Sequence, residues 1–170
     1  MSSHTTVSAA GHPGVGYERI VERFVSWART QSDIRAALVV GCRADKVAAA
    51  DSCFGLEIAV VTNSAREFCQ DESWLAELGD WVLSFQTTGP TGLPERRMLD
   101  TNGLDVTFVA VSTEAVERAI ASGEFSGLGP LLHRNMRVIL DQDGLIPRLV
   151  ARLHNPPPRL PTETEFLNAV

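Results

Sequence analysis

Three short apolar runs set the strongest constraint on how this chain can fold. They span residues 34–40, 56–61 and 104–109. Their length, apolarity and valine content are typical of strands that are buried in a sheet. The first run leads directly into a glycine turn at 41–43, and the other two runs each contain one acidic residue. The runs therefore predict a central sheet that carries polar groups on its buried strands.

Segments of helical periodicity separate these runs. Residues 17–30 place apolar side chains at three- and four-residue spacings, which predicts an amphipathic helix. The dipeptide Asn102-Gly103 predicts a hairpin that ends in the third apolar run. The other expected elements are helices at 64–69, 72–78 and 113–121 and strands at 81–86, 96–100 and 137–140. This alternation of strands and helices predicts an α/β (α+β) fold.

Composition and charge exclude several functional classes. The chain has 170 residues, of which 44% are hydrophobic and 21% charged, and this predicts one soluble domain with a real core. A net charge of −6 argues against strong binding to nucleic acid. No run approaches the roughly 18 apolar residues of a membrane span. Three cysteines without C-x-x-C spacing predict reduced thiols rather than a disulfide or a zinc site, which favours a cytoplasmic protein.

The two ends of the chain differ from its body. Residues 1–16 are small, polar and rich in glycine, and we expect a disordered arm there, followed by one folded domain at 17–154. Residues 155–161 are rich in proline and predict a stiff linker. Residues 162–170 start with a capping-box pattern and predict the first turns of a helix. We interpret this helix as the severed start of a second domain rather than as a helix docked on the body.

Two acidic residues on the apolar runs form a candidate metal site. Because side chains alternate along a strand, Glu57 and Asp105 can meet if their strands are neighbours. Such paired carboxylates hold Mg²⁺ against the triphosphate of a nucleotide such as ATP. The position two before Glu57, where this chemistry requires another carboxylate, is Gly55.

The turn after the first run supplies the candidate phosphate ligands. Gly41 and Cys42 would let backbone N–H groups approach phosphate closely, and Arg43 and Lys46 are the cations within reach. The plainer alternative is an ordinary turn with a solvated arginine. The order and spacing of all these residues favour a site. The pair Arg96-Arg97 is expected at a solvated hairpin edge rather than on phosphate.

The same residues resemble the aminoglycoside 6-adenylyltransferase (streptomycin adenylyltransferase) family. The resemblance covers nearly the whole chain after residue 16, and it rests on Ile34-Arg35-Ala36, Gly41-Cys42-Arg43, Asn102-Gly103-Leu104-Asp105-Val106-Thr107, the segment 138–144 and the segment 161–167. It implies a nucleotidyltransferase domain at 17–154, with a mixed sheet and helices packed mainly on one face. It also implies Mg²⁺-dependent transfer of AMP from ATP to an antibiotic hydroxyl, and a following helical domain that supplies the catalytic base.

The chain departs from the family pattern at the site itself. The family's Gly-Ser is Gly41-Cys42 here, and its Asp-x-Asp is Gly55-Leu56-Glu57, so that one metal ligand is missing and another is longer. Asp105 is retained. Asp51, in the loop before the second run, is a weak candidate to replace the missing ligand.

Two functional hypotheses follow. The favoured one is a catalytically impaired nucleotidyltransferase-like domain with a residual nucleotide- or partner-binding role, in which Glu57 and Asp105 keep the catalytic positions and bind Mg²⁺ weakly. The alternative is an active, divergent Mg²⁺-dependent adenylyltransferase that moves AMP from ATP to a hydroxyl of an aminoglycoside or another small molecule. The expected partners are a nucleotide, a small hydroxylated molecule, and a second copy or a helical partner at the C-terminus.

Overall fold

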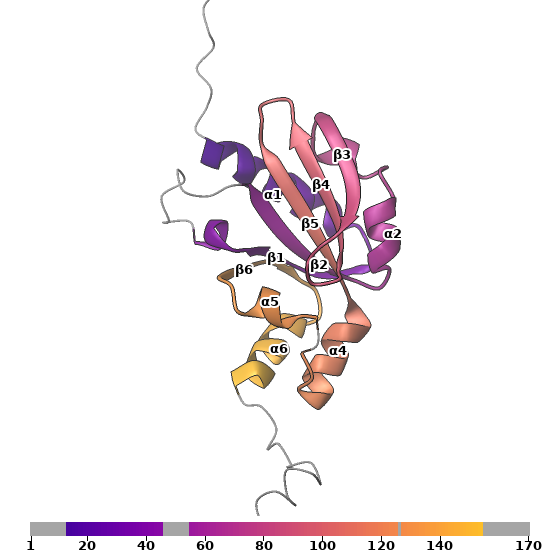
Figure 1. Ribbon diagram of the computed structural model, residues 1–170, viewed down its shortest axis with the longest axis vertical. Helices are drawn as coiled ribbons and strands as arrows, with labels where there is room; N and C mark the ends of the chain where they lie inside the picture. The colour runs from indigo at the N-terminus through magenta and orange to yellow at the C-terminus, as the bar shows by residue number, and fades with distance from the viewer. Residues whose placement is uncertain (1–12, 46–54, 126, 155–170) are drawn as a thin grey trace, which may run out of the picture.

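The computed structural model describes residues 13–45, 55–125 and 127–154 (Figure 1). Its helices are α1 (Pro13–Ala28), α2 (Ala65–Gln70), α3 (Leu75–Leu78), α4 (Thr113–Ser122), α5 (Gly129–Leu132) and α6 (Leu145–His154), with a short 3₁₀ turn η1 (Cys42–Ala44). Its strands are β1 (Ile34–Val40), β2 (Leu56–Thr62), β3 (Trp81–Thr88), β4 (Pro94–Asp100), β5 (Asp105–Ser112) and β6 (Met136–Asp141). In these residues no helix is long and apolar enough to cross a bilayer.

The six strands form one mixed sheet in the order β3-β4-β5-β2-β1-β6. The central pair, β2 and β5, is parallel, and all the other neighbours are antiparallel. The three strands expected from the apolar runs are therefore the three central ones. The expected mixed-sheet α/β fold is confirmed.

Helices cover both faces of this sheet, which corrects the expectation that they pack mainly on one. One face packs against α1, α2 and α3 around buried residues such as Phe24, Phe68 and Phe108. The other packs against α4, α5 and α6 around Val61, Val111 and other aliphatic residues, and Figure 1 shows these three helices gathered together. The physical reason is that β1, β2 and β5 are apolar on both sides, so each side must be buried.

Two of the three helices that cover the second face, α5 and α6, were not indicated by sequence periodicity. Helix α6 is only ten residues long, and it contains a proline in its first turn, where no backbone N–H is required. Its N-terminus is fixed by Asp141, whose carboxylate accepts hydrogen bonds from the backbone N–H groups of Leu145 and Ile146 at 3.0 and 3.1 Å. The last residue of β6 thus caps the helix that follows it.

The turn between β4 and β5 and the start of α1 can be compared with the sequence predictions. The hairpin at Asn102-Gly103 joins β4 to β5, and the Asp100 carboxylate accepts hydrogen bonds from the backbone of Asn102 and Leu104. Helix α1 begins at Pro13, so residues 13–16 belong to the folded domain and not to the expected arm. The rest of that arm, the linker at 155–161 and the helix at 162–170 lie outside the described residues.

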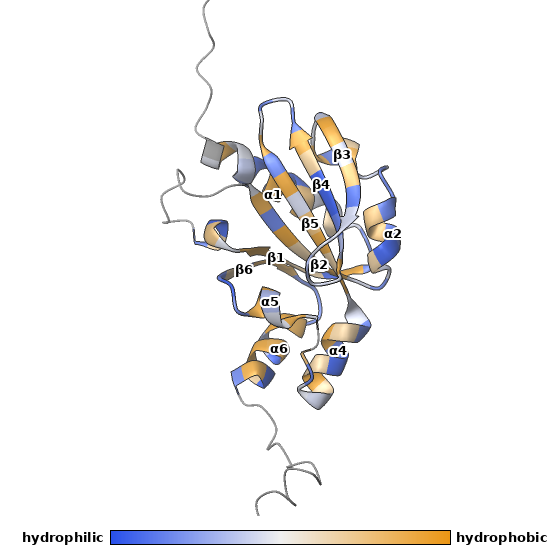
Figure 2. Ribbon diagram, in the orientation of Figure 1, coloured by the Kyte–Doolittle hydropathy of each residue, from blue (hydrophilic) through white to orange (hydrophobic). Residues whose placement is uncertain are grey.

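The edge strand β3 carries apolar side chains that the helices leave open. Val82, Leu83 and Phe85 are exposed, with Val82 the most open of the three. Their end of β3 is among the strongly apolar parts of the ribbon in Figure 2. Since β3 is the last strand on this side, its outer backbone groups have no neighbouring strand within the described residues.

Candidate functional site

Glu57 and Asp105 lie on neighbouring parallel strands and on the same face of the sheet. Glu57 is opposite Thr107, and Asp105 is two residues before Thr107 on β5. Both acids alternate with residues buried under α1–α3, so their side chains point to the face that α4–α6 cover only in part. Glu57 is about one quarter exposed and Asp105 about one half.

Gly55 lies directly beside the Asp105 carboxyl group. A Cβ atom on Gly55 would stand 3.5 Å from Cγ of Asp105 and 3.0 Å from the Asp105 backbone oxygen. The backbone of Gly55 has a φ of +75°, which L-residues rarely adopt. A carboxylate at position 55 would therefore lie next to the Asp105 carboxyl group. The positive φ at this position, however, favours glycine.

Arg134 closes the space between Glu57 and the glycine turn. Its Nη1 forms an ion pair with the Glu57 carboxylate at 2.6 Å. Its Nη2 lies 2.5 Å from the point where a Cβ on Gly41 would stand, so a side chain at position 41 would displace the guanidinium from its present place. Arg134 comes from the turn between α5 and β6, and its partner lies 77 residues away in the chain. Sequence reasoning missed it, because an isolated arginine in a turn carries no motif.

Asp105 also faces an arginine. Nη2 of Arg97 on β4 lies 3.6 Å from the Asp105 carboxylate, and both side chains are about half exposed. Arg97 is opposite Thr107 in the β4–β5 pairing, which places it on the same face as the two acids. Each candidate metal ligand is thus paired with a guanidinium group.

The residues of the glycine turn have structural contacts of their own. Nε of Arg43 donates a hydrogen bond to the Gly55 carbonyl at 2.7 Å, and the Arg43 guanidinium stacks over the Tyr17 ring at 3.8 Å. Arg43 therefore fastens the turn to the start of β2 and to α1. Lys46, the other candidate phosphate ligand, and Asp51 lie outside the described residues.

Of the two cysteines in the described residues, one departs from the expected reduced state and one does not. Cys42 is disulfide-bonded, so the expectation of three reduced thiols is wrong at this position. Cys69 is a free thiol in the interior. Burial raises the pKa of Cys69 to about 11, which keeps the thiol protonated and unreactive.

The donor set does not fit a magnesium site of the two-ion type. Mg²⁺ requires near-octahedral oxygen ligation, and two ions that face a triphosphate need several anchoring carboxylates. In the described residues no three His, Cys, Asp or Glu side chains gather closely enough to hold an ion. The two acids that do lie together are engaged by Arg134 and Arg97.

A third carboxylate, that of Glu95, stands near the pair. Burial, followed by the negative charge of Glu57, raises the pKa of Glu95, and the positive charge of Arg97 opposes this effect. Glu95 is opposite Val109 in the strand pairing and so shares the face of the two acids. Its ionised form is disfavoured in the folded protein.

We expect the substitution Glu95→Gln to stabilise the protein at neutral pH. A carboxyl group whose pKa is raised by folding lowers the free energy of unfolding at pH values above that pKa. The gain of the variant should disappear as the pH falls through the raised pKa, because the wild-type group is then protonated as well. Thermal unfolding at several pH values would measure this, with Glu117→Gln, an exposed site on α4, as the control. A variant less stable than the wild type at neutral pH would contradict it.

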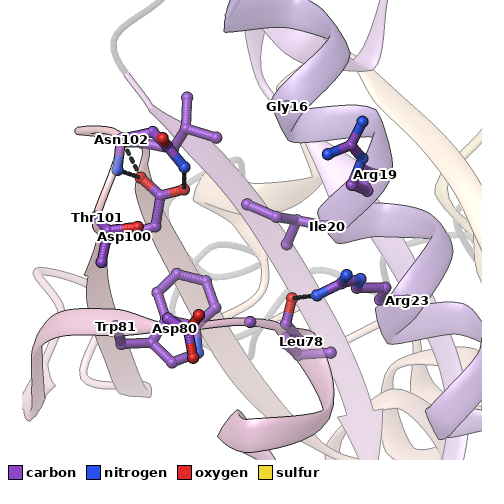
Figure 3. A pocket seen from close by; sticks show the side chains of 12 residues that line it. Gly16, Arg19, Ile20, Arg23, Leu78, Asp80, Trp81, Asp100, Thr101 and Asn102 are labelled. Carbon is purple, nitrogen blue, oxygen red and sulfur yellow. Dashed lines mark hydrogen bonds between the residues drawn. The ribbon is translucent and has the colours of Figure 1, made fainter.

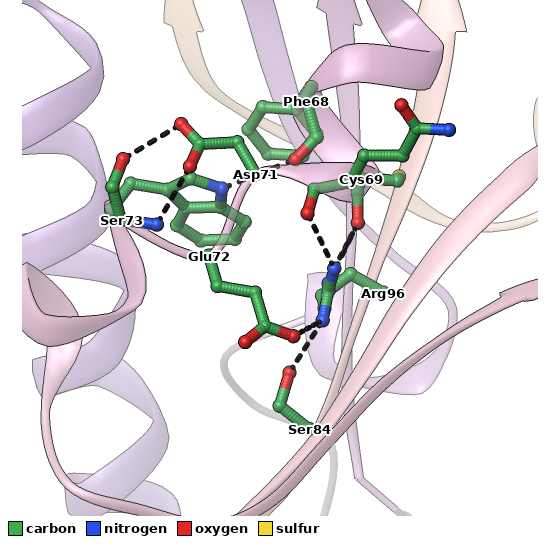
Figure 4. A network of polar contacts seen from close by, with 9 residues as sticks. Phe68, Cys69, Asp71, Glu72, Ser73, Ser84 and Arg96 are labelled. Carbon is green, nitrogen blue, oxygen red and sulfur yellow. Dashed lines mark hydrogen bonds and ion pairs between the residues drawn. The ribbon is translucent and has the colours of Figure 1, made fainter.

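Arg96, the neighbour of Arg97, is buried and structural, which corrects the expectation of a solvated edge. It is 2% exposed and donates hydrogen bonds to the backbone oxygens of Cys69 and Gln70 (Figure 4). Nη1 also contacts the Glu72 carboxylate at 2.5 Å and the Ser84 hydroxyl at 3.0 Å. Arg96 therefore connects β4 to the C-terminal end of α2, to Glu72 and to β3.

A polar cavity of about 180 Å³ lies between α1 and the turns that flank β3 and β4 (Figure 3). Arg23 lines it and donates a hydrogen bond to the Leu78 carbonyl, while Asp100 accepts from the Asn102 amide. Neither Glu57 nor Asp105 lines this cavity. Because its main polar groups serve the local structure, the candidate site is the cluster of Glu57, Asp105 and their arginines.

Comparisons with known proteins agree with the motifs quoted above. A family model described as streptomycin adenylyltransferase matches residues 16–170. A crystal structure of an aminoglycoside 6-adenyltransferase from Bacillus subtilis matches with 12% sequence identity and a TM-score of 0.45. That match covers 60% of this chain and only 37% of the other one. None of the curated proteins compared with the chain matches it.

Proposed function

Because this chain belongs to the streptomycin adenylyltransferase family, we propose that it is a nucleotidyltransferase-like domain that binds a nucleotide and is impaired in the transfer of AMP. The observation that supports this proposal is the pairing of the two acids with arginines. By the family resemblance, Glu57 and Asp105 would take the positions of metal ligands, and each is paired with an arginine. The neighbouring position, Gly55, offers no carboxylate.

The impairment follows from charge and geometry. Metal-dependent transfer needs carboxylates that are free to bind the ion and fixed in position. Even the loss of an outer partner of a metal ligand typically costs about 10–100-fold in affinity or activity. The absence of a first carboxylate at Gly55 therefore supports a larger loss. The nucleotide-binding role rests on the retained surroundings: the glycine turn, and arginines that suit phosphate.

The alternative function is an active, divergent adenylyltransferase with an aminoglycoside or another small hydroxylated molecule as its acceptor. The same-face position of Glu57 and Asp105 on adjacent strands favours it. In that case Mg²⁺ would have to displace Arg134 from Glu57, and both acids would be essential for transfer.

A transfer assay and a matched pair of variants test the proposal. The unmodified chain should bind ATP in calorimetry and should transfer no detectable AMP to streptomycin in the presence of Mg²⁺. The double variant Gly55→Asp, Glu57→Asp should gain Mn²⁺ binding, measured by electron paramagnetic resonance, because the new carboxyl group would adjoin that of Asp105.

The control for this gain is Gly55→Asn combined with Glu57→Asp. Asparagine imposes the same backbone strain as aspartate at a positive φ but adds no charge. A gain in both variants would show that strain, and not the carboxylate, changes the site. Robust transfer of AMP by the unmodified chain, abolished by Asp105→Asn, would overturn the proposed impairment and establish the alternative.

A further inference from the structure

The guanidinium group of Arg134 places a fixed positive charge in the candidate site. It is tied to Glu57 at 2.6 Å, and its second terminal nitrogen lies against Gly41. It thus occupies the space between a carboxylate and a glycine turn, which is where a metal-dependent site would hold its ion against phosphate. Because Gly41 has no side chain, the guanidinium group can lie directly against the turn.

Each of the two candidate metal ligands is matched by an arginine. Glu57 and Asp105 are matched by Arg134 and Arg97, and a divalent ion could bind the acids only by separating them from these partners. An incoming phosphate needs no such separation. A guanidinium group has five N–H donors, and Glu57 accepts from one of those of Arg134. The remaining donors have the planar arrangement that matches phosphate oxygens.

We propose that Arg134 takes the place of a divalent cation in this site, so that the triphosphate of a nucleotide binds without metal. This inference rests on the proposed nucleotide-binding function and specifies its chemistry. Arg97, about half exposed beside Asp105, provides a second guanidinium on the same face. Glu57 then competes with phosphate for Arg134.

The decisive variant is Glu57→Gln, because the two chemistries predict opposite results. If a metal ion binds the phosphate, loss of the Glu57 carboxylate weakens ATP binding. If Arg134 binds the phosphate, the same substitution frees its guanidinium group from a partly exposed ion pair. We then expect ATP to bind about two- to fivefold more tightly, in line with the modest energy of such pairs.

The experiment is calorimetric titration of the full chain with ATP, once with excess EDTA and once with excess Mg²⁺. We expect the wild type to bind ATP with equal affinity in the two buffers. Arg134→Gln should lower this affinity about tenfold. Arg134→Lys should lower it less, because lysine keeps the positive charge but not the planar guanidinium group. Arg118→Gln, which removes an exposed arginine paired with Glu114 on α4, should change nothing. Circular dichroism of each variant would confirm that it is folded.

The possible failures are distinguishable. Binding that requires Mg²⁺ and falls in Glu57→Gln would overturn the role of Arg134 and leave the nucleotide-binding function standing. Equal binding by the wild type and Arg134→Gln in EDTA would also overturn it. Absence of ATP binding in both buffers would overturn the nucleotide-binding function and this inference with it.

Discussion

Replacing Arg96 by alanine should lower the free energy of unfolding by about 3–5 kcal/mol. The guanidinium group is buried and donates to the carbonyls of Cys69 and Gln70, to Glu72 and to Ser84. Its removal leaves buried carbonyl oxygens without donors and opens a space between β4 and the C-terminal end of α2. For a domain whose total stability is typically about 5–15 kcal/mol, this is a large share.

The adjacent arginine provides the control. Arg97→Ala removes a half-exposed side chain whose partner, Asp105, lies 3.6 Å away, and it should change stability by about 1 kcal/mol or less. Urea unfolding of both variants, followed by tryptophan fluorescence, would measure the difference. Equal losses for the two variants would mean that Arg96 does not hold the network together.

Phe108→Ala should cost about 3–5 kcal/mol of stability. Phe108 is fully buried on β5, and its ring contacts Phe24 and Trp74 at centroid distances of 5.0 Å each. Truncation would leave a cavity at the centre of the core under α1–α3. The aromatic cluster around it would lose both apolar contact and edge-to-face packing.

The matched substitution is Phe85→Ala on the edge strand β3. Phe85 is 43% exposed, so the same chemical change should cost only about 1 kcal/mol, mainly through lower strand propensity. Thermal and urea unfolding of both variants would give the comparison. A loss at Phe85 as large as that at Phe108 would show that β3 is covered in the protein in solution.

The sequence predicted the parts of the fold that depend on local periodicity. The three apolar runs became the central strands β1, β2 and β5, and Asn102-Gly103 became a hairpin turn. The side on which Glu57 and Asp105 lie also followed from strand alternation. In each case the physical cause acts over a few neighbouring residues, so it is visible in the sequence.

The parts that the sequence did not predict depend on contacts between distant segments. Arg134 contacts Glu57, 77 residues away in the chain, and Arg96 is buried against the C-terminal end of α2. Neither contact has a motif. Helix α6 was missed because it is short, begins with a proline in its first turn and depends on Asp141 for its cap. The expectation that helices pack mainly on one face came from the family resemblance, and it did not include the cover that α5 and α6 give to the second face.

The parallel pairing of β2 with β5 has a consequence for folding kinetics. The two strands are fifty positions apart in the chain, since Leu56 lies opposite Val106, whereas β3, β4 and β5 form hairpins with their sequence neighbours. Closing so long a loop is entropically costly and slow compared with hairpin formation. We therefore expect the β3–β4–β5 meander to form early and the β2–β5 pair late, so that Glu57 and Asp105 come together only near the end of folding.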